Sequence, residues 1–80
     1  MNDTDIVQRI GTLADEEHQL ELSHAGQALS DAELERMRAI EVALDQCWDL
    51  LRQRRARRNA GEDPDLAVAR PEGVVEGYKQ

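Results

Sequence analysis

The stretch from Ser30 to Ala60, SDAELERMRAIEVALDQCWDLLRQRRARRNA, decides the fold because it is the longest segment with a regular helical pattern. Its start has the spacing of a capping box, in which the Ser30 hydroxyl and the Glu33 carboxylate each accept a hydrogen bond from a backbone N–H. Apolar side chains then recur every three or four residues, which predicts one apolar stripe along a helix over about residues 31–60. The members of this stripe are Leu34, Met37, Ile40, Leu44, Cys47, Trp48 and Leu51.

Beyond Leu51 the stripe gives way to basic residues, and Gly61 follows. Basic side chains suit a helix C-terminus because of the helix dipole, and glycine readily adopts the left-handed conformation that ends helices. These basic residues, called the arginine block below, are Arg52, Arg54, Arg55, Arg57 and Arg58.

A second helix is expected over about residues 5–25, with Asp3 or Thr4 as its N-cap. Gly26 is placed to end this helix, which leaves only Gln27, Ala28 and Leu29 before the capping box. A connection this short places the two helices side by side and antiparallel.

The spacing of the two stripes predicts how the helices pair. Facing residues have numbers that add up to 57, and both stripes advance in alternating steps of four and three, as in a left-handed antiparallel coiled coil. The predicted pairs are Asp3 with Arg54, Ile6 with Leu51, Ile10 with Cys47, Leu13 with Leu44, Glu17 with Ile40 and Leu20 with Met37. The predicted class is therefore all-α: a coiled-coil hairpin over residues 1–61 and a short C-terminal tail over residues 62–80.

Two helices alone bury little apolar surface in a chain of 80 residues. Small folds of this kind commonly gain their core by association, and two hairpins can pack as a four-helix bundle. We therefore expect a homodimer whose interface includes Val7, Leu34 and Trp48, which lie on the outer flank that a single hairpin would leave in water. The alternative role for Trp48 is to lie under the tail.

Composition favours a soluble protein of the reducing cytoplasm. The chain has one cysteine, so an internal disulfide is not possible, and its start does not resemble a signal peptide. No apolar run approaches the roughly 20 residues that span a bilayer, so no membrane association is expected. No cofactor is predicted.

Residues 62–80 have two possible interpretations. Their polar, glycine-containing makeup is typical of a disordered tail. Alternatively, Asp63 and Pro64 begin one further helical turn through Leu66 and Val68, and the tail folds back along the second helix. In that case acidic residues of the tail would mask part of the arginine block, and apolar residues such as Val74, Val75 and Tyr78 would cover its overhanging end.

The run LDQCWDLLRQRRARR at residues 44–58 resembles a family of short, uncharacterised actinobacterial proteins known as a domain of unknown function. Asp63-Pro64-Asp65, Arg70-Pro71 and VVEGY at residues 74–78 extend the resemblance over nearly the whole chain. The resemblance implies a small bacterial cytosolic protein that stands alone. It supplies no functional residue, because the family has no assigned activity.

No residue set predicts a reaction. Glu21 and His24 have the Glu-x-x-His spacing of carboxylate-bridged metal sites, with Glu17 or Glu33 as further carboxylates, but acids are abundant enough here for that spacing to arise by chance. Cys47 is predicted to be a small buried seam residue rather than a redox thiol, because no second cysteine or adjacent histidine accompanies it. We expect no enzyme and no metal site.

Two functions are compatible with these features. The surplus apolar flank favours a protein–protein interaction or adaptor module, working as a homodimer with a further, unidentified protein partner. The arginine block is the alternative signal, for a nucleic-acid or ribosome-associated factor that binds anions. Carboxylates opposite and after the block could instead pair with the arginines, and no aromatic residue is interleaved for base stacking.

Overall fold

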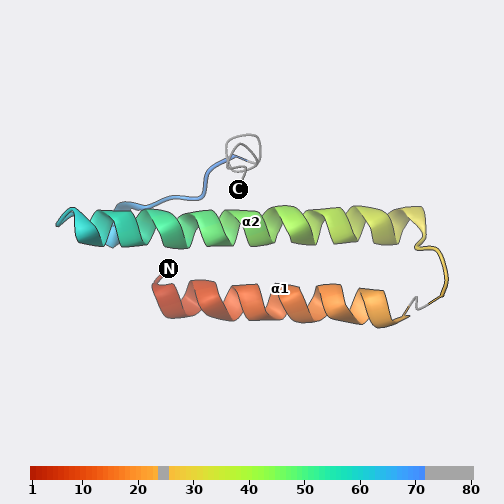
Figure 1. The fold of residues 1–80 in the computed structure, drawn as a ribbon. Helices are drawn as coiled ribbons and strands as arrows, with labels where there is room; N and C mark the ends of the chain where they lie inside the picture. The colour runs from red at the N-terminus through yellow and green to blue at the C-terminus, as the bar shows by residue number, and fades with distance from the viewer. Residues whose placement is uncertain (24–25, 72–80) are drawn as a thin grey trace.

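Two antiparallel helices make up most of the computed structural model, which describes residues 1–23 and 26–71. Helix α1 spans Asp3–Ser23, helix α2 spans Asp31–Asn59, and a 3₁₀ turn, η1, spans Pro64–Leu66. The helices lie side by side, joined at one end by a short connection (Figure 1). The described residues contain no strand, and the predicted all-α helical hairpin is confirmed.

Reciprocal hydrogen bonds begin both helices. At the start of α2, the Glu33 backbone N–H donates to Ser30 Oγ at 3.2 Å and the Ser30 N–H donates to Glu33 Oε1 at 2.9 Å, as the capping box predicted. At the start of α1, the Asp5 N–H donates to Asn2 Oδ1 at 2.8 Å and the Asn2 N–H donates to Asp5 Oδ2 at 3.1 Å. The expected caps Asp3 and Thr4 are therefore wrong, because Asn2 and Asp5 have the spacing that such a pair of bonds requires.

Glycines follow the two helices in the left-handed conformation, with φ of 79° at Gly26 and 75° at Gly61. At the end of α2, the N–H of Glu62 donates to the carbonyl of Arg57 at 2.7 Å and that of Gly61 to the carbonyl of Arg58 at 3.1 Å. This pair of bonds is a Schellman motif, which satisfies the last carbonyls and turns the chain away from the helix axis. Helix α1 is described up to Ser23, and the expected end at residue 25 lies outside the described residues.

The core is a single seam between α1 and α2. Its buried members are Ile6 and Leu13 from α1 and Ile40 and Cys47 from α2, and Ile6 and Ile40 are fully buried. The ion pair between Asp3 and Arg54 agrees with the predicted register at the open end of the hairpin. Apolar side chains that pack against the seam are Ile10, Leu20, Ala43, Leu44, Leu50 and Leu51.

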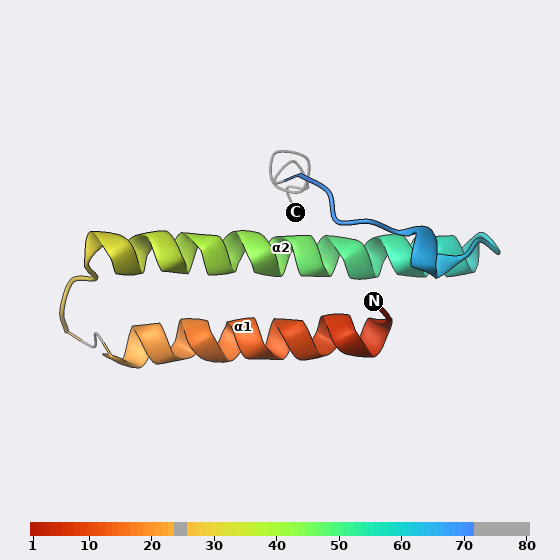
Figure 2. The same ribbon diagram turned by 180° about the vertical axis from the view of Figure 1, so that it is seen from behind.

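Residues 62–71, called the strap below, run back along the outside of α2 from its C-terminal end (Figure 2). η1 lies within the strap, and Asp63 caps it by accepting a hydrogen bond from the Asp65 N–H at 2.9 Å. The turn expected at Asp63 and Pro64 is present, but it ends at Leu66 rather than Val68. None of the described helices carries an apolar stretch long enough to cross a membrane.

Candidate interaction surface

One side of the hairpin carries large apolar side chains that the described chain leaves about half exposed. Val7 directly follows the core residue Ile6, and Trp48 directly follows Cys47. In antiparallel helices, residues that follow the core positions by one lie on the same flank of the seam. The register also places Val7 and Trp48 at the same level of the hairpin. We call this side, which carries Val7, Leu34 and Trp48, the open face.

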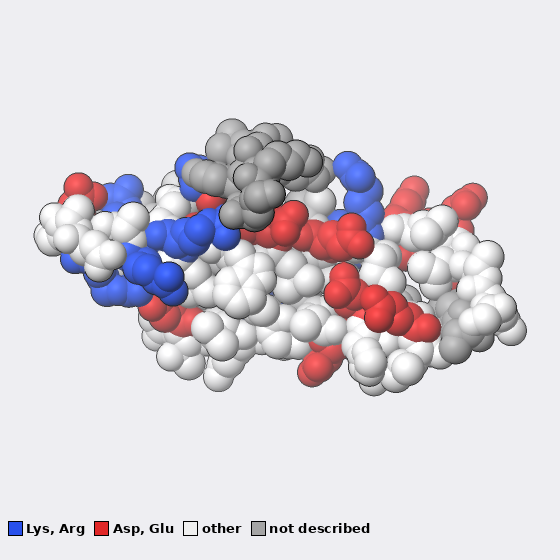
Figure 3. Space-filling view, viewed as in Figure 1, with Lys and Arg blue, Asp and Glu red and all other residues white. Residues whose placement is uncertain are grey.

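Large apolar side chains on the open face are about half exposed. The exposed fraction is 56% for Val7, 53% for Leu34 and 50% for Trp48. Figure 3 shows an uncharged patch on the hairpin that is bordered by acidic side chains, with arginine side chains gathered toward the free end of α2. A contiguous exposed apolar surface that is bordered by charged side chains is typical of a protein interface. The role of these three residues in an interface stays a prediction.

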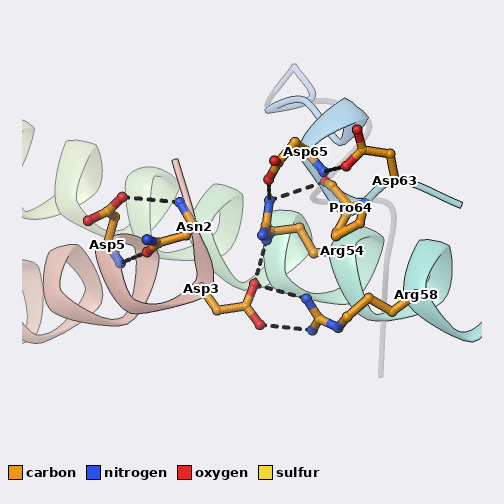
Figure 4. Close-up of polar contacts among 8 residues, drawn as sticks. All are labelled: Asn2, Asp3, Asp5, Arg54, Arg58, Asp63, Pro64 and Asp65. Atoms are coloured by element: carbon orange, nitrogen blue, oxygen red, sulfur yellow. Dashed lines mark hydrogen bonds and ion pairs between the residues drawn. The ribbon is translucent and has the colours of Figure 1, made fainter.

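Arg54 is the most buried member of the arginine block, with 6% of its surface exposed. Its guanidinium group donates to the Asp3 carboxylate, to Asp65 Oδ1 at 3.0 Å and to the Pro64 carbonyl at 3.2 Å (Figure 4). Arg58 also contacts Asp3, at 2.8 Å. Arg54 therefore joins the start of α1, the end of α2 and the strap at one point.

These contacts change the acidity of Asp3. Hydrogen bonds from Arg54 and then Arg58 hold the pKa of Asp3 below its ordinary value, because both stabilise the ionised carboxylate.

The other members of the arginine block differ in their partners. Arg57 pairs with Glu62 of the strap at 3.2 Å. Arg52 lies 3.9 Å from Asp49. Arg55 is exposed and forms no ion pair with any residue that the structure describes. The arginine block is thus largely neutralised by the protein's own carboxylates.

Asp49 is a buried acid on the outer side of α2 that the sequence interpretation missed. Its side chain is fully buried and accepts hydrogen bonds from Arg70, one of them at 2.8 Å from Nε to Oδ2. Gln53 Nε2 donates to the same oxygen at 3.0 Å. The Arg70 contact, and secondarily the Gln53 contact, lower the pKa of Asp49 against the opposing effect of burial. Two-point binding by a guanidinium group is a strong and geometrically specific contact.

Two glutamines hold the backbone of the strap. Gln53 Nε2 donates to the carbonyl of Val68 at 2.7 Å, and Gln46 Nε2 donates to the carbonyl of Arg70 at 3.4 Å. Together with Asp49 they form a polar ladder along the outer side of α2. The spacing of this ladder, Gln46, Asp49 and Gln53, is the signal in the sequence that could have located the strap.

The strap is held against α2 by polar contacts, and its larger apolar side chains stay exposed. Leu66 is 61% exposed and Val68 is 66% exposed. The expectation that tail apolar side chains cover the end of α2 is therefore wrong for these two residues. The expected fold-back and partial masking of the arginine block are present in the strap. Val74, Val75 and Tyr78 lie outside the described residues.

The depressed pKa of Asp49 predicts acid-induced loosening of the strap. A carboxylate whose pKa is lower in the folded protein than in the unfolded chain stabilises the fold at pH values above its pKa in the unfolded chain. That stability is lost as the pH falls below the ordinary value of 3.8 and through the folded value. We expect wild-type protein to exceed the Asp49→Asn variant in thermal stability at neutral pH, and the difference to shrink below pH 3.8. Melting curves across this range test it, and a difference that is constant with pH would contradict it.

Cys47 lies in the seam, as its position in the stripe predicted. Cys47 is 8% exposed, and burial raises the pKa of its thiol, partly opposed by Arg9. A raised pKa lowers the fraction of reactive thiolate at neutral pH. Within residues 1–23 and 26–71 no group of three metal-binding side chains comes together. The candidate ligand His24 lies outside that part of the chain.

Comparison with known proteins identifies the family. Proteins of Mycobacterium bovis and Mycobacterium tuberculosis, both named only as uncharacterised, are 50% identical to the chain over 78 residues. Each alignment covers 95% of this chain and 88% of the relative. No solved structure matches the chain. Residues 2–80 match the family described as protein of unknown function DUF2630, and the chain belongs to this family.

Proposed function

We propose that this protein is a non-enzymatic, cytoplasmic interaction module that binds another protein through its open face. The observation that carries the proposal is the half-exposed Trp48, with Val7 beside it on the neighbouring helix. Tryptophan is enriched among the residues that dominate binding energy at protein interfaces. A two-helix seam with four buried apolar residues buries little apolar surface, so a partner that covers the open face would stabilise the hairpin further.

The alternative function, binding of nucleic acid or ribosome through the arginine block, has weaker support. A phosphate would compete with Asp3, Asp65 and Glu62 for guanidinium groups already engaged. Neutralisation of phosphates by free cationic side chains supplies most of the affinity of such proteins. Arg55 is the exposed member that would remain available for an anion.

Site-specific photocrosslinking tests the proposal. A photoreactive amino acid is placed at Val7 on the open face, or at Asp15 on the far side of α1 as the matched control, in the full chain expressed in a mycobacterium. We expect protein adducts from position 7 and not from position 15, and we expect Trp48→Ser in the same chain to abolish them. Equal adducts from both positions, or adducts that persist without Trp48, would show that the open face is not an interaction site.

A further inference from the structure

We infer that the occupant of the open face is a second copy of this chain, running in the opposite direction, with the two Trp48 side chains at the twofold axis. In this arrangement Arg55 of each copy lies beside Glu41 of the other. The inference rests on the proposed interaction role of the face and adds the identity of the partner.

Glu41 and Arg55 on α2 carry opposite charges and are equally spaced about Trp48. Glu41 lies seven residues before Trp48 and Arg55 seven residues after it, so the three share one heptad position and lie on one side of α2. Each step of seven residues is about 10.5 Å along the axis of a helix. Glu41 and Arg55 are exposed, and neither forms an ion pair with a described residue.

A twofold interface must be complementary to itself, because the same surface is used by both copies. When two α2 helices lie antiparallel with their Trp48 residues facing each other, Glu41 of each copy lies opposite Arg55 of the other copy. It also brings Asp45, three residues before Trp48, close to Arg52, four residues after it. An unrelated protein partner would not require acids and bases to be spaced evenly about one residue. This spacing is the feature that favours a second copy.

Two other ways of packing two copies bring like charges together on the open face. Copies that run in the same direction would place one arginine block beside the other. Copies that run in opposite directions but place Leu34 against Trp48 would bring Glu41 onto Glu41. Like charges placed directly opposite each other weaken an interface. The inferred packing therefore centres on Val7 and Trp48, and Leu34, about 21 Å from Trp48 along the helix, lies toward the edge.

The strap leaves room for this partner. It attaches to α2 through Gln46, Asp49 and Gln53, on the outer side of the helix. In Figure 2, which views the hairpin from behind, η1 lies in front of α2, whereas Figure 1 views the hairpin from the opposite side. A second copy on the open face would bury Trp48 and Val7 without displacing the strap.

Charge exchange between chains tests the inference. The variants Glu41→Arg and Arg55→Glu each place like charges at both symmetric contacts of a homodimer. An equal mixture of the two restores opposite charges at both contacts, because each chain then meets the partner that carries the other substitution. Glu35→Arg, an exposed site away from the open face, is the matched control for the change of charge.

Sedimentation velocity at micromolar concentration gives the result. We expect wild type and Glu35→Arg to sediment at twice the chain mass of 9.0 kDa. Each open-face variant should raise the dimer dissociation constant by about tenfold or more, and the mixture should return it toward the wild-type value. Circular dichroism checks that the helices are retained in every variant.

Two outcomes overturn the inference in different ways. A wild-type monomer at these concentrations would show that the partner is not a second copy. Dimers that resist both single substitutions, or that the mixture does not restore, would show that the packing is not centred on Trp48. Neither outcome removes the proposed function, because Trp48-dependent adducts with a different protein would still mark the open face as an interaction site.

Discussion

Replacing Ile40 by alanine is expected to lower the free energy of unfolding by about 2–5 kcal/mol, as for other large-to-small changes in protein cores. Ile40 is fully buried in the seam, and the cost combines lost transfer of apolar surface with the cavity that remains. A seam with four buried apolar residues has few others to compensate. A loss near the upper end of this range would leave the hairpin largely unfolded at room temperature, since folded domains are only marginally stable.

Leu22→Ala is the control for this prediction, because it removes a similar side chain from a helix position that is 58% exposed. Surface substitutions of this kind usually change stability by about 0.5 kcal/mol or less. Urea unfolding at one fixed protein concentration measures both variants, so that any self-association affects them equally. Similar losses for Ile40→Ala and Leu22→Ala would contradict the placement of the core in the seam.

Removing the Arg70 side chain is expected to lower the free energy of unfolding by about 1–3 kcal/mol, the typical effect of losing hydrogen bonds to a charged group. The Asp49 carboxylate would lose its main partner, and the strap would lose its firmest attachment to α2. Release of the strap would let water reach Asp49. The free energy of unfolding therefore falls by less than it would for an acid left without a partner in a closed core.

A double-mutant cycle separates this contact from unrelated effects. The Asp49→Ala and Arg70→Ala substitutions are measured alone and together by urea unfolding. Residues in direct contact typically show coupling of about 0.5–3 kcal/mol. We expect coupling in this range, because once one of the two side chains is removed, the second substitution can no longer break the contact between them. Strictly additive losses would mean that Asp49 and Arg70 do not act as a pair.

The hairpin could be predicted from the sequence because its determinants are local or periodic. The capping box at Ser30 lies within four residues, and the apolar stripes fix the phase of each helix separately. Once the short connection made the helices antiparallel, agreement between two stripes specified the register, including the contact between Asp3 and Arg54. The Asn2 cap was missed because the two acidic or hydroxyl residues after it are equally good cap types.

The strap contacts could not be predicted in the same way. Asp49 is one of 17 acids in the chain, and on a two-helix hairpin its outward position suggests a solvated charge. Its partner Arg70 is 21 residues away, in a segment with no periodic pattern. Pairing between a helix and an irregular segment depends on the path of that segment, which begins at the Gly61 turn. Composition and periodicity carry no information about such a path.

The contacts of Arg54 have a consequence for how the protein is made. Asp3 is synthesised before the other two residues of this cluster: Arg54 follows 51 residues later, and Asp65 later still. At translation rates of about 5–20 residues per second, the first carboxylate waits roughly 3–10 s for its guanidinium partner. During that interval α1 has neither the closing ion pair nor most of the seam. The open end of the hairpin is therefore completed only after both Arg54 and Asp65 have been synthesised, so the helix that is made first is the one that waits for its closing contacts.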